Sequence, residues 1–177
     1  MTLQLIRAGS DPELAFSPIV SSGPNSANPH AEPSNRVLKS GDLLVIDWGA
    51  RYKGYISDLT RTIGIGKIQP ELENMVKLVL DANQAGCNIA RHGIEAGIID
   101  KTARALIENG GFGLNFTHRT GHGIGLEAHE PPYIFGENDL ILEDGMCFTI
   151  EPGIYLAGQN GARIEDNIVI TGDGVKI

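Results

Sequence analysis

The segment LEDGMCFTIE, residues 142–151, decides the fold because an earlier segment, LKSGDLLVID at residues 38–47, follows the same pattern. Each begins with leucine and reaches a glycine at its fourth position, and six residues after that glycine comes a carboxylate, Asp47 or Glu151. The glycine favours a tight turn, and the apolar residues after it predict a strand. The chain therefore contains two diverged copies of one turn-and-strand unit.

The likeness extends outward from both segments. HAEP at residues 30–33 precedes the first copy and HEPP at residues 129–132 precedes the second, while Asp58 and Glu165 follow, each on the returning strand of a hairpin. Glycine followed by an acidic residue is a common turn signature, so a chance match is the alternative. Three features that keep their order favour a true repeat. We expect two pseudo-equivalent halves, each delivering two carboxylates and one histidine to the line where they meet.

The site residues predict a metal centre. Alternation along a strand places Val45 and Asp47 on one face, and a carboxylate at the end of an apolar strand is costly to bury unless it is paired or binds a cation. Four carboxylates and one imidazole can hold two divalent cations, which activate water against an amide or ester. A ligand set without thiolate suits Mn²⁺, Co²⁺, Fe²⁺ or Zn²⁺ in a reactive site better than structural zinc. The predicted ligands are Asp47, Asp58, His122, Glu151 and Glu165.

Composition sets limits on the remaining function classes. The chain has 177 residues with 41% hydrophobic residues, enough for the core of a single domain spanning 1–177. A net charge of −8 argues against nucleic acid as a partner. Cys87 and Cys147 are far apart and without a CxxC motif, which indicates reduced thiols in the cytoplasm. No signal-peptide pattern and no apolar run of about 20 residues is found, so no membrane partner is expected.

Periodicity predicts a mixed α+β chain. The end of a helix is expected in residues 1–8, strands at 16–20 and 43–46, and a returning strand at 52–65 with its turn near Lys53-Gly54. Apolar residues at helical spacing predict helices over 70–91, opened by Pro70, and over 96–109. Strands are expected from residue 112 onward. Three further histidines, His30, His118 and His129, are candidates for proton transfer or for holding a tetrahedral intermediate.

These motifs, in this order, resemble the pita-bread metallopeptidases, a family that includes methionine aminopeptidases, aminopeptidase P, prolidase and the metal-free creatinase. The resemblance implies an α+β fold with two pseudo-symmetric halves around a curved antiparallel sheet. It implies that Asp47 binds one metal, that His122 and Glu151 bind the other, and that Asp58 and Glu165 bridge them. A hydroxide held between the metals would attack the scissile carbonyl, and Glu151 would accept its proton.

The run HRTGHGIGLEAHE, residues 118–130, is similar to the proline-peptidase branch, in which a histidine stands four residues before the metal-binding one. That branch implies cleavage before proline, an Xaa-Pro aminopeptidase or dipeptidase, with two metal ions, Mn²⁺ foremost. It implies peptide substrates with proline second, contacts from His30, His118, His129, Tyr155 and Arg163, and a homodimer. The family's first-half helices are largely missing here, so an N-terminally incomplete catalytic domain is expected. A methionine aminopeptidase and a catalytically silent binding scaffold are the alternatives.

Overall fold

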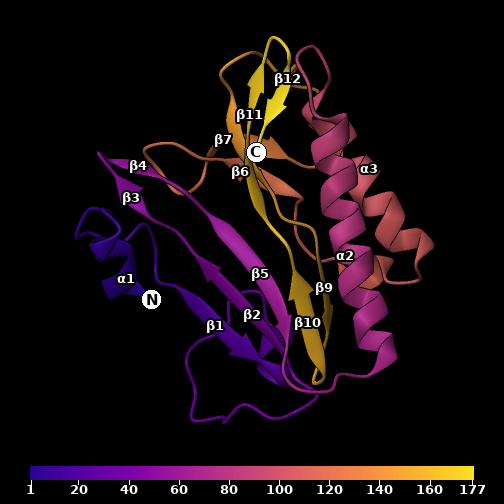
Figure 1. The fold of residues 1–177 in the computed structure, drawn as a ribbon. Coiled ribbons are helices and arrows are strands. Elements are labelled where there is room, and N and C mark those ends of the chain that lie inside the picture. Colours follow the sequence, from indigo (N-terminus) through magenta and orange to yellow (C-terminus); the bar gives the residue numbers. More distant parts are fainter.

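The computed structural model describes residues 1–177, in which two consecutive long helices stand between two sets of antiparallel strands along the chain (Figure 1). The helices are α1 (Thr2–Arg7), α2 (Pro70–Ile89) and α3 (Ala96–Asn109), with 3-10 helices η1 (Gly23–Ala27) and η2 (Gly113–Asn115). The strands are β1 (Ile19–Ser22), β2 (Leu43–Trp48), β3 (Arg51–Tyr52), β4 (Tyr55–Ile56), β5 (Leu59–Gly64), β6 (Gly121–Gly123), β7 (Glu130–Ile134), β8 (Cys147–Ile150), β9 (Gly153–Leu156), β10 (Asn160–Arg163), β11 (Asp166–Thr171) and β12 (Gly174–Lys176).

The first half is the antiparallel sheet β1-β2-β5, whose central strand carries the expected alternation. Leu43, Val45 and Asp47 are buried on one face of β2, and the residues between them are only half-buried. In the register of β2 and β5, Asp47 lies opposite Thr60. The prediction that Val45 and Asp47 share a face is therefore confirmed.

Two expected strands of this half are placed differently. The strand expected at 16–20 begins only at Ile19, directly after Pro18, which has no backbone N–H to give to a ladder. The returning strand expected at 52–65 is interrupted at Ser57-Asp58, between β4 and β5. Its turn lies as predicted at Lys53-Gly54, where both residues have positive φ (52° and 86°), the conformation favoured in two-residue hairpins.

The second half repeats this plan in the sheet β12-β11-β8-β6-β7. The repeated plan is a strand, a small two-stranded hairpin and a returning strand: β2, β3–β4 and β5 in the first half, and β8, β9–β10 and β11 in the second. An isolated bridge between Thr60 and Glu165 joins the two halves where the returning strands meet. The expected pair of pseudo-equivalent halves is confirmed.

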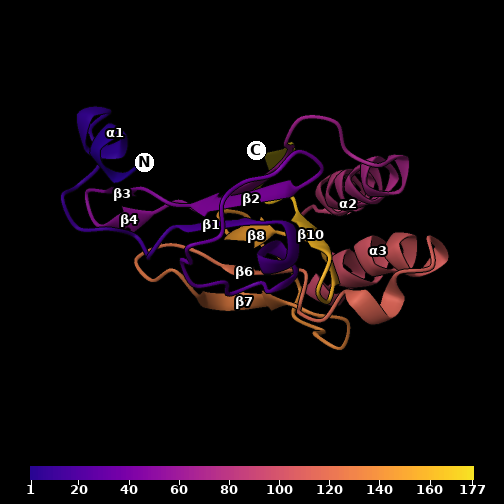
Figure 2. The same cartoon turned by 90° about the horizontal axis from the view of Figure 1, so that it is seen from below.

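Helices α2 and α3 pack against the strands of the second half, and both contribute to each of the two core clusters (Figure 2). Their buried positions include Met75, Val79, Ile99 and Ile107, at the helical spacing that predicted both elements. Helix α2 ends at Ile89 and not near Arg91, the end expected from the sequence. The segment expected to be strand-like from residue 112 begins with η2, and its first strand, β6, starts at Gly121. No helix combines the length and the apolar character needed to cross a membrane, and both cysteines are free.

Candidate metal centre

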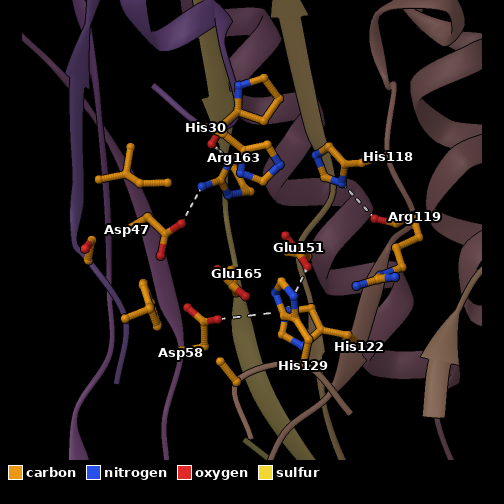
Figure 3. A pocket seen from close by; sticks show the side chains of 15 residues that line it. His30, Asp47, Asp58, His118, Arg119, His122, His129, Glu151, Arg163 and Glu165 are labelled. Carbon is orange, nitrogen blue, oxygen red and sulfur yellow. Dashed lines mark hydrogen bonds and ion pairs between the residues drawn. The ribbon is translucent and has the colours of Figure 1, made fainter. Parts of the chain in front are cut away.

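A cavity of about 590 Å³ lies where the two halves meet, and it collects nearly all of the predicted site residues (Figure 3). The predicted residues that line it are His30, Asp47, Asp58, His118, His122, His129, Glu151, Arg163 and Glu165. Tyr155 does not line it. The rest of the wall comes from Phe16, Ser17, Ile19, Pro29, Ala128 and Arg119.

The four carboxylates stand at equivalent places in the two halves. Asp47 and Glu151 lie at the ends of β2 and β8, one inside its strand and one directly after it. Asp58 and Glu165 immediately precede the returning strands β5 and β11. The strand breaks at Ser57-Asp58 and between β10 and β11 thus turn a carboxylate from each half into the same cavity.

His122 offers a ring nitrogen to this cluster. Its Nδ1 lies 3.0 Å from the carbonyl oxygen of Gly123, so the ring donates its Nδ1 proton there and keeps the lone pair of Nε2 free. That Nε2 lies 3.3 Å from Glu151 Oε1 and 3.9 Å from Asp58 Oδ2. Potential ligand atoms of Asp58, His122 and Glu165 all lie within 4.8 Å of one another. A cation between them can therefore be bound by both halves.

The glycines beside His122 are needed to bring this strand close to its neighbours. A Cβ on Gly121 would collide with the carbonyl oxygen of Thr149 in β8, and one on Gly123 with the carbonyl oxygens of Glu130 and Pro131. The two glycines therefore allow close backbone contacts on both sides of β6. Any side chain there would push His122 away from the carboxylates.

The carboxylate cluster is electrostatically unfavourable without cations. Burial, with the charge of Glu165 as the next cause, raises the pKa of Asp58 to about 10, and burial raises the pKa of Glu151 well above its usual value. Burial and the charge of Asp47 raise the pKa of Glu165 to about 7. Asp47 Oδ1 and Asp58 Oδ1 are buried without a hydrogen-bond partner. Oxygen atoms that are buried, crowded and unpartnered fit the ligand set of divalent cations.

Two threonine hydroxyls donate hydrogen bonds to carboxylates of the cluster. Thr60 Oγ1 donates to Glu165 Oε2 over 2.6 Å, and Thr149 Oγ1 donates to Glu151 Oε1 over 3.4 Å. Our sequence analysis missed both roles. The signal was present for Thr60, which stands two residues after Asp58 at the start of the returning strand. For Thr149, the same spacing places its side chain beside Glu151.

Arg163 is held in place by four contacts inside the protein. Its Nη2 donates to Asp47 Oδ2 over 2.6 Å, its Nη1 to Tyr155 Oη over 2.9 Å, and its Nε to Thr60 Oγ1 over 3.2 Å. Nη1 also lies 3.5 Å from the carbonyl oxygen of Pro29. Arg163 thus reaches the cavity wall, while Tyr155 stands behind it as a buried hydrogen-bonding partner.

The three spare histidines have different surroundings. His118 is half-buried, with Nδ1 2.7 Å from the carbonyl oxygen of Arg119 and Nε2 2.8 Å from Tyr155 Oη, and burial lowers its pKa to about 4. It is therefore neutral at physiological pH. His30 and His129 are exposed at the cavity wall, and the ring centroid of His129 lies 4.0 Å from that of His122.

The loop that carries His118 is anchored to α3 by an ion pair between a buried carboxylate and a half-buried guanidinium, which our sequence analysis did not identify. Asp100 and Arg104 pair through two hydrogen bonds of 2.9 and 3.0 Å. Arg104 also donates to the carbonyl oxygens of Phe116 and His118, at 3.0 and 2.8 Å. Asp100 accepts from both the backbone and the hydroxyl of Thr120. The Asp100 and Arg104 side chains, one helical turn apart, thus fix the approach to β6.

Comparisons with known proteins agree with this geometry. A model of metallopeptidase family M24 matches residues 2–172. The chain is 43% identical over 164 residues to an Xaa-Pro dipeptidase of Lactobacillus delbrueckii subsp. lactis, covering 93% of this chain and 45% of that protein. Among solved structures, a dipeptidase from Pyrococcus horikoshii OT3 matches with 49% identity and a TM-score of 0.93, over 98% of this chain and 48% of that one.

A prolidase from Pyrococcus furiosus superposes with a TM-score of 0.94 at 41% identity, over 98% of this chain and 51% of that one. These likenesses confirm the pita-bread fold predicted from the sequence motifs. The chain spans about half the length of the curated relatives it matches.

Proposed function

Because this chain belongs to metallopeptidase family M24, we propose that it is the catalytic part of an exopeptidase that hydrolyses the peptide bond before proline. The reaction is that of an Xaa-Pro dipeptidase or Xaa-Pro aminopeptidase. The observation that carries the proposal is the convergence of four carboxylates and the free Nε2 of His122 on one cavity. The names of relatives, Xaa-Pro dipeptidase and prolidase, support the choice of substrate.

The proposed centre holds two divalent cations, Mn²⁺ foremost, with Co²⁺, Fe²⁺ and Zn²⁺ compatible with the same donors. Asp47 is assigned to one ion and His122 with Glu151 to the other, while Asp58 and Glu165 are shared. When bound, such ions would supply Lewis-acid chemistry that activates water and polarises the scissile carbonyl. Glu151 is assigned as the group that takes up the proton because it lies in the cavity, with its Oε1 3.3 Å from His122 Nε2.

The chain's own residues supply orientation around the bond. His118 is neutral at pH 7 because burial lowers its pKa, so it lines the cavity without adding a charge, and its contacts with the Arg119 carbonyl and Tyr155 Oη fix the orientation of its ring. His30 and His129 stand at the exposed wall, where the ends of a substrate enter. Proline has no N–H, so a pocket for its ring needs no acceptor for that nitrogen. This supports a role for Phe16 and Ile19 as the apolar wall.

Partners other than peptides remain predictions. The net charge of −8 supports the absence of a nucleic-acid partner. The family resemblance supports a homodimer, and two free cysteines without a CxxC motif support a cytoplasmic location. Neither the oligomeric state nor the compartment enters the proposed mechanism, because every assigned metal ligand comes from this one chain.

A competition assay tests the proposal. The chain, loaded with Mn²⁺, is offered Gly-Pro, an Xaa-Pro-Xaa tripeptide and Met-Ala-Ser together, and the products are followed by mass spectrometry. Cleavage before proline that is lost in excess chelator and in Glu165→Gln is the expected result. Release of methionine alone would assign the chain to methionine aminopeptidases. No cleavage by a folded, metal-loaded chain would favour the silent scaffold.

A further inference from the structure

Two arginine side chains line the cavity, and only one of them already forms an ion pair within the chain. Arg163 is held by an ion pair to Asp47 and by hydrogen bonds to Tyr155 and Thr60. Arg119 also lines the cavity, but its guanidinium makes no hydrogen bond and no ion pair with any residue of the chain. A guanidinium has five N–H donors in a planar fork. Arg119 thus presents unused donors to whatever enters the site.

The direction of this side chain is set by an aromatic ring. The guanidinium carbon of Arg119 stacks 4.5 Å from the ring centroid of Tyr133 in β7. In Figure 3 the side chain extends from the segment before β6 toward Glu151 and the histidines. The stack leaves the edge of the fork, where the N–H groups lie, free for a planar anion.

The backbone beneath Arg119 is fixed on both sides. Before it, the carbonyl oxygen of His118 accepts a 2.8 Å hydrogen bond from Arg104. Its own carbonyl oxygen accepts a 2.7 Å hydrogen bond from His118 Nδ1. After it, the Thr120 amide donates to the carbonyl of Ile134 at 2.9 Å and lies 3.1 Å from Asp100 Oδ1. An arginine held in this way loses little conformational entropy when it binds an anion.

We propose that Arg119 receives the free C-terminal carboxylate of a dipeptide whose second residue is proline, and so determines a preference for dipeptides over longer peptides. The inference rests on the proposed function. In such a dipeptide the carboxylate is attached to the Cα next to the nitrogen of the scissile bond. In a longer peptide the same position holds a neutral amide. A guanidinium binds a carboxylate through two parallel, charge-assisted hydrogen bonds, which an amide cannot match.

The experiment compares Ala-Pro with Ala-Pro amide, which differ only in the charge at this position. In the unmodified chain loaded with Mn²⁺, we expect kcat/KM to be at least about tenfold higher for the acid. Arg119→Gln should lower kcat/KM for Ala-Pro by roughly tenfold to a hundredfold, mainly through KM, and change that for the amide less than about twofold. Arg119→Lys should restore part of the difference, because it keeps the charge but not the fork.

Arg91→Gln is the matched control, since Arg91 is exposed and lies outside the cavity. It should leave both substrates unaffected. If Arg119→Gln instead lowered the rates for acid and amide alike, Arg119 would be acting on the charge of the metal cluster, and the proposal would be overturned. Equal turnover of acid and amide by the unmodified chain would overturn it as well.

A binding measurement separates this inference from the proposed reaction. Titration calorimetry with L-proline and L-prolinamide at millimolar concentration follows the carboxylate contact without turnover. Stronger binding of L-proline that disappears in Arg119→Gln supports the assignment even if no peptide is cleaved, in which case only the proposed function fails. Equal binding of the two compounds, or an unchanged difference in the variant, overturns the assignment.

Discussion

Replacing Asp58 with asparagine should make the metal-free chain more stable, although the same change should destroy the metal centre. Asp58 is buried, and burial together with the charges of Glu165, Asp47 and Glu151 raises its pKa to about 10. In the unfolded chain its pKa is about 4. Between these values the folded chain holds a proton that the unfolded chain has lost, so stability decreases as pH rises.

The size of the effect follows from this difference. Each pH unit above the unfolded pKa costs about 1.4 kcal/mol per proton taken up. At pH 7.5 the cost is on the order of 5 kcal/mol. Asparagine is neutral and of the same shape, so it removes this cost. After allowing about 1–3 kcal/mol for imperfect hydrogen bonding of the new amide, we expect a gain of at least about 2 kcal/mol, or roughly 4–8 °C in Tm.

Urea and thermal unfolding at pH 5 and pH 7.5, in EDTA and in Mn²⁺, measure the effect. In EDTA the advantage of Asp58→Asn should shrink from pH 7.5 to pH 5, where the proton costs only about 1.4 kcal/mol. In Mn²⁺ the order should reverse, because bound ions stabilise only the unmodified site. Asp173→Asn, on the exposed turn between β11 and β12, is the control. A variant less stable than the unmodified chain in EDTA at pH 7.5 would refute the reasoning.

Three further changes test other parts of the site. Burial lowers the pKa of His118 to about 4, so the unfolded chain takes up a proton here before the folded chain does, and the folded chain becomes less stable as pH falls from about 6.5 to 4. In His118→Gln the free energy of unfolding should therefore fall less steeply across that range, by up to about 1.4 kcal/mol per pH unit. Arg104→Ala leaves Asp100 buried without its cation and should cost about 3 kcal/mol in chemical denaturation, with at least a tenfold loss of kcat/KM that Arg104→Lys partly recovers. Gly121→Ala drives a methyl group into a carbonyl of β8 and should cost several kcal/mol and weaken Mn²⁺ binding measured by calorimetry, whereas Gly136→Ala, whose Cβ meets only ordinary contacts, should be near neutral in both.

Local patterns predicted most of the helices and strands, and they identified the carboxylates and the histidine that meet in the cavity. Strand alternation placed Asp47 on the buried face of β2, and helical spacing identified α2 and α3 before any contact was known. The duplicated segment also anticipated that the halves would repeat, because turn residues and strand-end carboxylates keep a fixed spacing within each half. Such signals depend on neighbours a few residues away, so the linear order is enough to detect them.

The protonation states of the carboxylates depend on the tertiary structure. Nothing near Asp58 in the chain indicates a pKa of about 10, because that shift requires burial and carboxylates from positions 47, 151 and 165. In the same way, both Arg119 and Arg163 stood in motifs with site residues, and only the folded chain shows which of them is already paired.

The sequence by itself thus determined the elements, the repeat and the kinds of ligand available. Tertiary structure decided which oxygens remain unpartnered, that Tyr155 lies behind Arg163, and that Arg119 keeps its donors free. The physical reason is that hydrogen bonds and desolvation act over a few ångströms in space. Thr60 and Glu165 are 105 residues apart in the chain. Thr60 Oγ1 comes within 2.6 Å of Glu165 Oε2 only when both halves pack around one cavity.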